Sequence, residues 1–136
     1  MRPLIPCLLL ALAGCAATPQ ETARAQAEQA QRADKLATRL AGFTPGQPQD
    51  CLTNFPGDRP SETIGSTILY VQSPKLIYRN DTSGGCEGME RGDYIVTVSN
   101  GGRLCRGDIG RTFQPTVGNI PTGSCALGAF VPYSKP

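Results

Sequence analysis

The sequence predicts a mainly β protein: a small antiparallel sandwich or barrel that is stapled by disulfides and preceded by one N-terminal helix. Residues 51–136 hold 13 of the 16 glycines, with short β-branched and aromatic runs between them, which is typical of an all-β domain. Four cysteines are spread through the same region. The preceding stretch, up to residue 41, is rich in Ala, Gln, Arg and Glu and almost free of helix breakers, which favours a helix.

The four cysteines of the C-terminal region indicate two disulfides if the protein is exported. They are Cys51, Cys86, Cys105 and Cys125. Four cysteines allow three pairings; we favour the nested pairs Cys51–Cys125 and Cys86–Cys105, because they tie the ends of the domain together. A zinc site would need closely spaced ligands, and the chain has no histidine. No metal and no other cofactor is expected.

The chain begins with a short apolar run that resembles a bacterial export signal. Residues 4–13 are too few for a membrane span, which needs roughly 20 residues, but suit the core of a secretory signal. The run ends in Leu12-Ala13-Gly14-Cys15, which resembles the lipobox of bacterial lipoproteins. That resemblance implies a diacylglycerol on Cys15 and removal of residues 1–14 as a signal peptide. A plain secretory signal and an uncleaved signal anchor are the alternatives.

The residues after Cys15 suggest where the protein resides, and the overall charge bears on its partners. Ala16 and Ala17 replace the aspartate that retains lipoproteins at the inner membrane. Resemblance to the enterobacterial sorting rule therefore implies an outer-membrane lipoprotein facing the periplasm. Several acyl chains would anchor it stably, so the membrane is one expected partner. The formal net charge is only +2, and nucleic acid is not expected to bind.

Residues 15–42 are predicted to form the lipidated N-terminus and a helical spacer. Thr18 suits the N-cap, with Pro19 in the first turn and Glu21 placed to close a capping box, and Gly42 offers a stop. The last turns carry the large apolar side chains, which we expect to dock on the domain: Leu36, Leu40 and Phe43. A solvated spacer is favoured over a helix that oligomerises or binds a partner.

The remaining chain divides into a hinge and a β domain. Residues 43–50, with two prolines and a glycine, predict an irregular hinge, and residues 51–136 form the β-rich disulfide domain. A hairpin is expected where residues 67–71 and 76–79 flank Ser73-Pro74-Lys75. The segments 81–92 and 107–123 are rich in turn residues and are expected to be connections.

A second hairpin and a final strand complete the expected domain. Residues 94–99 and 102–106 flank Asn100-Gly101, which favours a type I′ turn and would set Cys105 opposite Val96. The last strand is expected over residues 125–131, limited by Pro132. Most aromatic residues should lie in the core: Tyr70, Tyr78, Tyr94, Phe113, Phe130 and Tyr133.

Four stretches from Leu40 onward form a distinctive set. They are Leu40-Ala41-Gly42 followed by Gly46, Pro48 and Cys51; Ile77-Tyr78-Arg79-Asn80; Arg103-Leu104-Cys105-Arg106-Gly107-Asp108; and Gly123-Ser124-Cys125-Ala126-Leu127-Gly128-Ala129-Phe130. Together they resemble a family of small exported or lipid-anchored proteobacterial proteins with no assigned activity. The resemblance covers nearly the whole C-terminal domain. It implies no catalytic residue.

Catalysis is not expected from these residues. The chain lacks histidine, the commonest general acid or base. A carboxylate-dependent hydrolase would have to cluster acidic residues that the sequence places in turns: Glu87, Glu90, Asp93 and Asp108. Asn80-Asp81-Thr82 matches a glycosylation sequon but is interpreted as a polar turn.

The favoured function is therefore a non-enzymatic envelope lipoprotein that acts as a binding or structural module, with an envelope protein as its possible partner. A periplasmic inhibitor of a lytic enzyme, similar to lipid-anchored lysozyme inhibitors in size and compartment, is the alternative. A small cationic face is a further possibility, against a mixed, solvated surface as the default. It would comprise Arg79, Arg103, Arg106 and Arg111.

Overall fold

The computed structural model describes residues 17–53, 60–99, 101–116 and 118–136. The expected signal peptide and Cys15 lie outside the described residues. Helix α1 (Pro19–Arg39) comes first, and the short 3-10 helix η1 (Glu87–Arg91) lies between β5 and β6. The strands are β1 (Thr44–Pro45), β2 (Cys51–Leu52), β3 (Ser61–Ile64), β4 (Thr67–Ser73), β5 (Leu76–Asp81), β6 (Tyr94–Thr97), β7 (Leu104–Cys105), β8 (Ile109–Phe113), β9 (Pro121–Ala126) and β10 (Phe130–Ser134).

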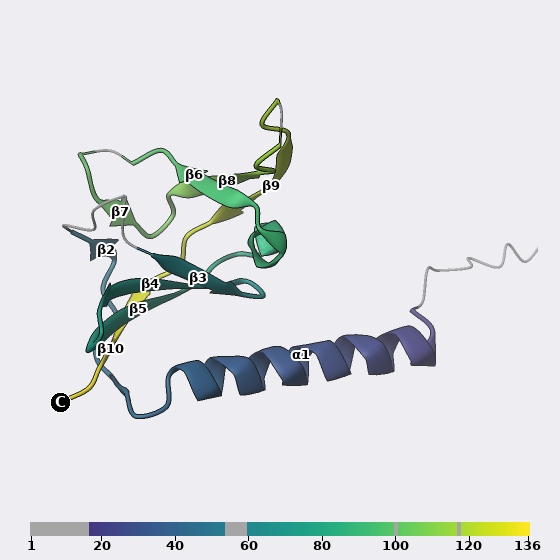
Figure 1. The fold of residues 1–136 in the computed structure, drawn as a ribbon, viewed down its shortest axis with the longest axis horizontal. Coiled ribbons are helices and arrows are strands. Elements are labelled where there is room, and N and C mark those ends of the chain that lie inside the picture. Colours follow the sequence, from purple (N-terminus) through teal and green to yellow (C-terminus); the bar gives the residue numbers. More distant parts are fainter. Residues whose placement is uncertain (1–16, 54–59, 100, 117) are drawn as a thin grey trace, which may run out of the picture.

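The strands form three antiparallel sheets in a sandwich-like arrangement. A five-stranded sheet has the order β1-β10-β5-β4-β3, a three-stranded sheet has the order β6-β8-β9, and β2 pairs with β7. Helix α1 runs along one side of the five-stranded sheet, and the three-stranded sheet lies on the other side (Figure 1). The predicted mainly β fold with one N-terminal helix and two disulfides is confirmed.

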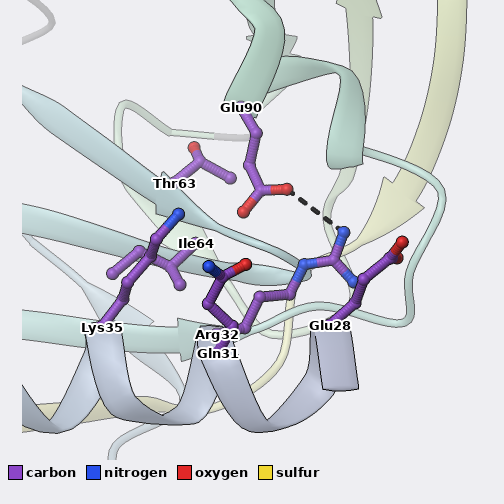
Figure 2. Close-up of a pocket in the computed structure, with 7 residues that line it drawn as sticks. All are labelled: Glu28, Gln31, Arg32, Lys35, Thr63, Ile64 and Glu90. Carbon is purple, nitrogen blue, oxygen red and sulfur yellow. Dashed lines mark hydrogen bonds and ion pairs between the residues drawn. The ribbon is translucent and has the colours of Figure 1, made fainter. Parts of the chain in front are cut away.

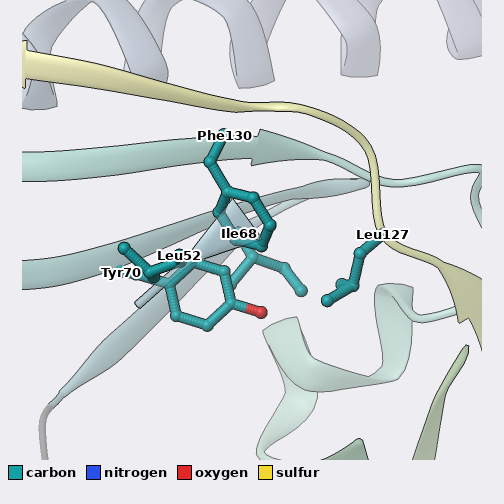
Figure 3. Packing of buried hydrophobic residues seen from close by; sticks show 5 residues of the cluster. All are labelled: Leu52, Ile68, Tyr70, Leu127 and Phe130. Carbon is teal, nitrogen blue, oxygen red and sulfur yellow. The ribbon is translucent and has the colours of Figure 1, made fainter. Parts of the chain in front are cut away.

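Strand β4 is buried on both faces, which accounts for its uninterrupted apolar run. Ile68 and Tyr70 join Leu52, Leu127 and Phe130 in one cluster (Figure 3). The ring centroids of Tyr70 and Phe130 are 5.7 Å apart, and burial raises the pKa of the Tyr70 hydroxyl. The alternate residue, Leu69, lies in a second cluster with Leu40 and Ile77 on the helix side of the sheet.

Helix α1 begins and docks as predicted. The Glu21 backbone N–H donates to Thr18 Oγ1 (3.2 Å), and the Thr18 N–H donates back to Glu21 Oε2 (2.8 Å), which completes the capping box. At the other end, Leu36 and Phe43 pack against the second cluster. The N-terminal half extends past the sheet (Figure 1).

An ion pair also fixes the helix to the sheet. Arg39 donates from Nε (2.6 Å) and Nη2 (2.7 Å) to the two oxygens of Glu62 on β3. This bidentate geometry is the strongest form of the pair. Hydrogen bonds from Arg39 hold the pKa of Glu62 below its ordinary value, so the pair stays ionised at neutral pH.

The segment 43–50 is not an irregular hinge throughout. Its residues Thr44–Pro45 form β1 and pair with β10, and Gln49 forms a bridge with Phe130. The Gly46 N–H donates to the Pro132 carbonyl (2.7 Å). The connection from α1 therefore closes one edge of the five-stranded sheet.

The two predicted hairpins have different outcomes. The hairpin at Ser73-Pro74-Lys75 is confirmed, since β4 pairs with β5. The one at Asn100-Gly101 is wrong: β6 pairs with β8, so Val96 lies opposite Arg111. Asn100 itself lies outside the described residues. The chain between β6 and β8 leaves their sheet, because β7 pairs with β2 instead.

The predicted disulfide pairing is also wrong. The bridges are Cys51–Cys105 and Cys86–Cys125. Cys51 lies directly opposite Cys105 in the β2–β7 pair, so the first bridge clips this two-stranded ribbon. The second joins the segment before η1 to β9 and is buried. The two bridged segments overlap along the chain and are not nested. The sheet pairings decide which cysteines lie close together.

The chain after residue 107 contains more strand than predicted. Strand β8 and the start of β9 lie within 107–123, which was expected to be a connection. The expected final strand over 125–131 is interrupted between Ala126 and Phe130, where the chain leaves the three-stranded sheet and enters the five-stranded one. Pro132 lies inside β10 and does not end it.

Candidate functional site

An exposed group of apolar side chains lies on the outer surface of the three-stranded sheet. Its members, here called the apolar face, are Tyr94, Val96, Val98, Ile109 and Phe113. Val98 is 79% exposed, Ile109 51% and Val96 47%. Four of the five, all but Tyr94, line a depression of about 620 Å³ together with Asp108 and Arg111. Tyr94 stacks on Phe113 with ring centroids 5.7 Å apart.

The alternation of β6 explains why this face is exposed. Successive strand residues point to opposite sides of a sheet, and here both sides are apolar. Ile95 points inward and packs against the first core cluster. Tyr94 and Val96 therefore point away from the core, opposite Phe113 and Arg111 of β8. Contiguous apolar surface of this kind, bordered by polar groups, marks interaction sites in soluble proteins.

The sheet beneath the apolar face is held rigidly. Buried Thr112 and its neighbour Thr122 are joined through their hydroxyls (3.0 Å), and Thr122 also donates to Asp93 Oδ2 (2.6 Å). These bonds connect β8, β9 and the residue before β6. The Cys86–Cys125 bridge ties β9 to the segment before η1. A partner would thus meet a preformed surface, which limits the ordering entropy that binding costs.

Arg111 is the cation at the centre of this surface. It belongs to the middle strand of the sheet, between Val96 on β6 and Ser124 on β9. Arg111 is exposed to solvent. Among the residues that the structure describes, Arg111 has no ion pair. Its charge is therefore available to a ligand that lies on the apolar face.

The predicted cationic face is not formed by all four arginines. Arg79 pairs with Asp81 on β5 (3.0 Å), in the five-stranded sheet and not in the sheet of Arg111. Arg106 lies 3.9 Å from Asp50, with both side chains exposed. Arg103 is exposed in the chain between β6 and β7. Of the four arginines, Arg111 is the one that lines the depression beside the apolar face.

The four candidate catalytic carboxylates have separate partners. Glu87 accepts from the Gly85 N–H (2.9 Å), and Asp108 accepts from the Cys105 N–H (2.7 Å). Glu90 accepts from the Gly65 N–H (2.6 Å) and pairs with Arg32, while Asp93 is bonded to Thr122. Glu87, Glu90 and Asp108 each hold a turn, and Asp93 is joined to β9. Within the described part of the chain, no three acidic or cysteine side chains are grouped to hold a metal.

A second hollow, of about 510 Å³, lies between α1 and the sheet (Figure 2). The Arg32 guanidinium points to Glu90 across it, at 3.4 Å. Because Glu90 also binds the turn at Gly65, this contact fastens the middle of α1 to the turn between β3 and β4. The hollow is lined by charged side chains of both signs, since Lys35 and Glu28 also line it. The hollow is better explained as part of the helix attachment than as a ligand site.

The sequon residue Asn80 was predicted to lie in a polar turn, and this prediction is wrong. Asn80 lies in β5 and is fully buried. Its Nδ2 donates to the Gly128 carbonyl (2.8 Å), and its Oδ1 accepts from the Gly128 N–H (2.9 Å). The amide replaces ladder bonds where the chain crosses from β9 to β10. Asn80 is therefore structural.

The aromatic residues divide between the core and this site. Tyr70 and Phe130 are buried as predicted, but Tyr94 is 38% exposed. The signal missed in the sequence is the repeat Tyr94, Val96, Val98, which puts three apolar side chains on the side of the strand opposite Ile95. An exposed strand face would normally carry polar residues there.

No family model matches the chain, and searches of curated proteins and of solved structures find no match. In the described part of the chain, none of the helices is long and apolar enough to cross a membrane. Function must therefore be inferred from the residues and their geometry.

Proposed function

We propose that this protein is a lipid-anchored module of the bacterial cell envelope that binds another envelope protein through the apolar face. The observation that carries the proposal is the exposed apolar surface on a rigid, disulfide-stapled sheet. Such a surface is costly to leave in water and is a common feature of protein-binding sites. The anchoring half of the proposal derives from Leu12-Ala13-Gly14-Cys15.

The arrangement of the layers supports this role. Ile95 packs inward against the core, and α1 covers the opposite side of the five-stranded sheet. The apolar face is thus on the layer farthest from the helix (Figure 1). A chain that is attached through its N-terminus and α1 leaves this layer free to contact a partner. The helix then serves as the spacer.

The anchoring half predicts a lipid on Cys15. Mass spectrometry of the N-terminal peptide from the exported protein should give Cys15 as the first residue, carrying the mass of a diacylglycerol. The Cys15→Ser variant should move from the membrane fraction to the soluble fraction, because the acyl chains supply the attachment. An unmodified N-terminus at any other residue would contradict anchoring but would leave the binding face untouched.

The binding half predicts a discrete partner at the apolar face. A photo-crosslinking amino acid placed at Val98 or at Ile109 in intact cells should give the same crosslinked species. Lys75, an exposed residue between β4 and β5 of the five-stranded sheet, is the matched control position and should not give it. Val96→Asp should abolish the Ile109 crosslink, since it places a charge inside an apolar contact.

The Val96→Asp variant must keep the fold for this result to count. Val96 is exposed, so the thermal unfolding midpoint of the variant should stay within a few degrees of that of the unsubstituted protein. Identical crosslinks at Val98, Ile109 and Lys75, or none at any of them, would contradict the proposal.

A further inference from the structure

Strand β6 offers a free edge beside the apolar face. It is the terminal strand of the β6-β8-β9 sheet, with β8 on one side and no described strand on the other. An edge strand presents unpaired backbone N–H and C=O groups, which an extended peptide can use by adding a further strand. Alternate side chains of the added strand would lie on the apolar face, beside Tyr94, Val96 and Val98.

The position of Arg111 defines the charge of such a strand. Neighbouring strands are about 4.8 Å apart, so the added strand would lie roughly 10 Å from β8, across Val96. An arginine side chain extended over Val96 and a glutamate side chain reaching back can span this separation. The residue of the added strand opposite Val96 should therefore be acidic, and its two neighbours on the same face should be apolar.

A second copy of this chain fits the edge less well. If two β6 strands paired about a two-fold axis at Val96, Arg111 of each copy would lie on the same face, with the two cations on either side of the axis. Asp108 would lie towards the Phe113 end of the partner copy, away from the other arginine. The residue of the second copy that lies opposite Val96 would be its own Val96, so the second copy offers Arg111 no counter-charge at this position, whereas an acidic strand does.

We propose that β6 binds an extended acidic segment of the partner protein by strand addition, with a glutamate of that segment paired to Arg111. The inference rests on the proposed function, because it names the chemistry of the partner at the same face. The backbone bonds of β6 would supply affinity, and Arg111 would select the partner. The apolar side chains on either side of the glutamate would fill the depression beside Val98 and Phe113.

The test uses synthetic peptides and the full chain purified in detergent. The probe is acetyl-Ser-Val-Thr-Glu-Thr-Val-Ser-amide with a fluorescent label, and its matched controls carry Gln or Lys in place of Glu. We expect the Glu peptide to bind roughly threefold to tenfold more tightly than the Gln peptide, the range of an exposed to partly desolvated ion pair. Raised salt should reduce this difference.

Charge reversal gives the decisive comparison. Arg111→Glu should weaken binding of the Glu peptide and restore binding of the Lys peptide, whereas Arg103→Glu should change neither. Arg103 is exposed, lies between β6 and β7, and is not among the residues that line the depression. Hydrogen exchange of the β6 backbone N–H groups should slow when the Glu peptide binds, since strand addition occupies that edge.

Three outcomes would overturn the inference. They are equal binding of the Glu and Gln peptides, no binding of either, and concentration-dependent dimerisation of the chain through β6. If the crosslinks at Val98 and Ile109 persist in any of these cases, the binding face stands and only the acidic strand is wrong. If those crosslinks are absent as well, both proposals fail.

Discussion

Replacing Asn80 with alanine is expected to lower the free energy of unfolding by roughly 3–5 kcal/mol. The amide makes two short hydrogen bonds to the backbone of Gly128 in a site with no solvent exposure. Its removal leaves the N–H and the carbonyl of half-buried Gly128 without their partner, at about 1–3 kcal/mol each, and opens a small cavity at the fully buried Asn80 position. Urea denaturation of the oxidised protein, with its exposed apolar face unchanged, measures the loss.

A matched control separates burial from the hydrogen bond itself. Ser83 Oγ accepts from the Ala126 N–H at 2.9 Å, in an exposed position close to the same crossing. Water can replace this hydroxyl, so Ser83→Ala should cost about 1 kcal/mol or less. Equal losses of unfolding free energy for Asn80→Ala and Ser83→Ala would show that the two hydrogen bonds between the Asn80 amide and Gly128 have no special role.

The isosteric change Asn80→Asp adds a test with a defined pH dependence. A carboxylate keeps the bond from the Gly128 N–H but faces the Gly128 carbonyl without a proton to donate. Burial raises the pKa of such a group above its unfolded-state value, so the folded state favours its protonated form. The deficit in stability relative to the unsubstituted protein should therefore shrink as the pH falls from 7 towards 4. A deficit that grows on acidification would contradict this account.

The elements that depend on neighbouring residues are the ones that the sequence predicts well. The capping box of α1 is contained in Thr18 to Glu21, and the β4–β5 turn lies within a few residues of both its strands. Their energetics are local. The docking residues Leu36 and Leu40 could also be identified, because the rest of the helix offers hardly any other large apolar side chain.

The pairing of distant strands could not be predicted in the same way. Asn100-Gly101 is a good local turn signal, yet β6 pairs with β8, since the inward side chain of Ile95 packs over Gly110. The disulfides follow from this topology: Cys105 reaches Cys51 through the β2–β7 pair. Spacing alone could not distinguish the three possible pairings.

The candidate site could not be predicted from the sequence for a related reason. Val96 and Ile109 are typical core residues by type, and only their partners across the sheet show which side they occupy. Ile95 and Val96 differ by one position along the strand, and that position decides between the core and the surface. Arg111 likewise gains its importance from its place between Val96 and Ser124, which the sequence does not display.

The second large effect is expected at Gly123, where alanine should cost about 3 kcal/mol. A Cβ at Gly123 would meet the Gly85 carbonyl oxygen, and a Cβ at Gly85 would meet the Ser124 carbonyl oxygen. The two backbones are in direct contact, next to the Cys86–Cys125 bridge that joins them. Neither can retreat, so the added methyl must distort β9, and overpacking of this kind typically costs 1–3 kcal/mol and occasionally more.

Gly110→Ala is the matched control within the same sheet. Its Cβ would meet Cγ1 and Cδ1 of the Ile95 side chain and not backbone; because a side chain can shift more easily than two joined backbones, the cost should be smaller than that of Gly123→Ala. The Gly123→Ala penalty should also fall when Cys86 and Cys125 are both replaced by serine, because the segments can then separate. A double-mutant cycle measures this coupling. An unchanged penalty without the bridge would mean that the sheet pairing of β9, and not the disulfide, keeps the two backbones in contact.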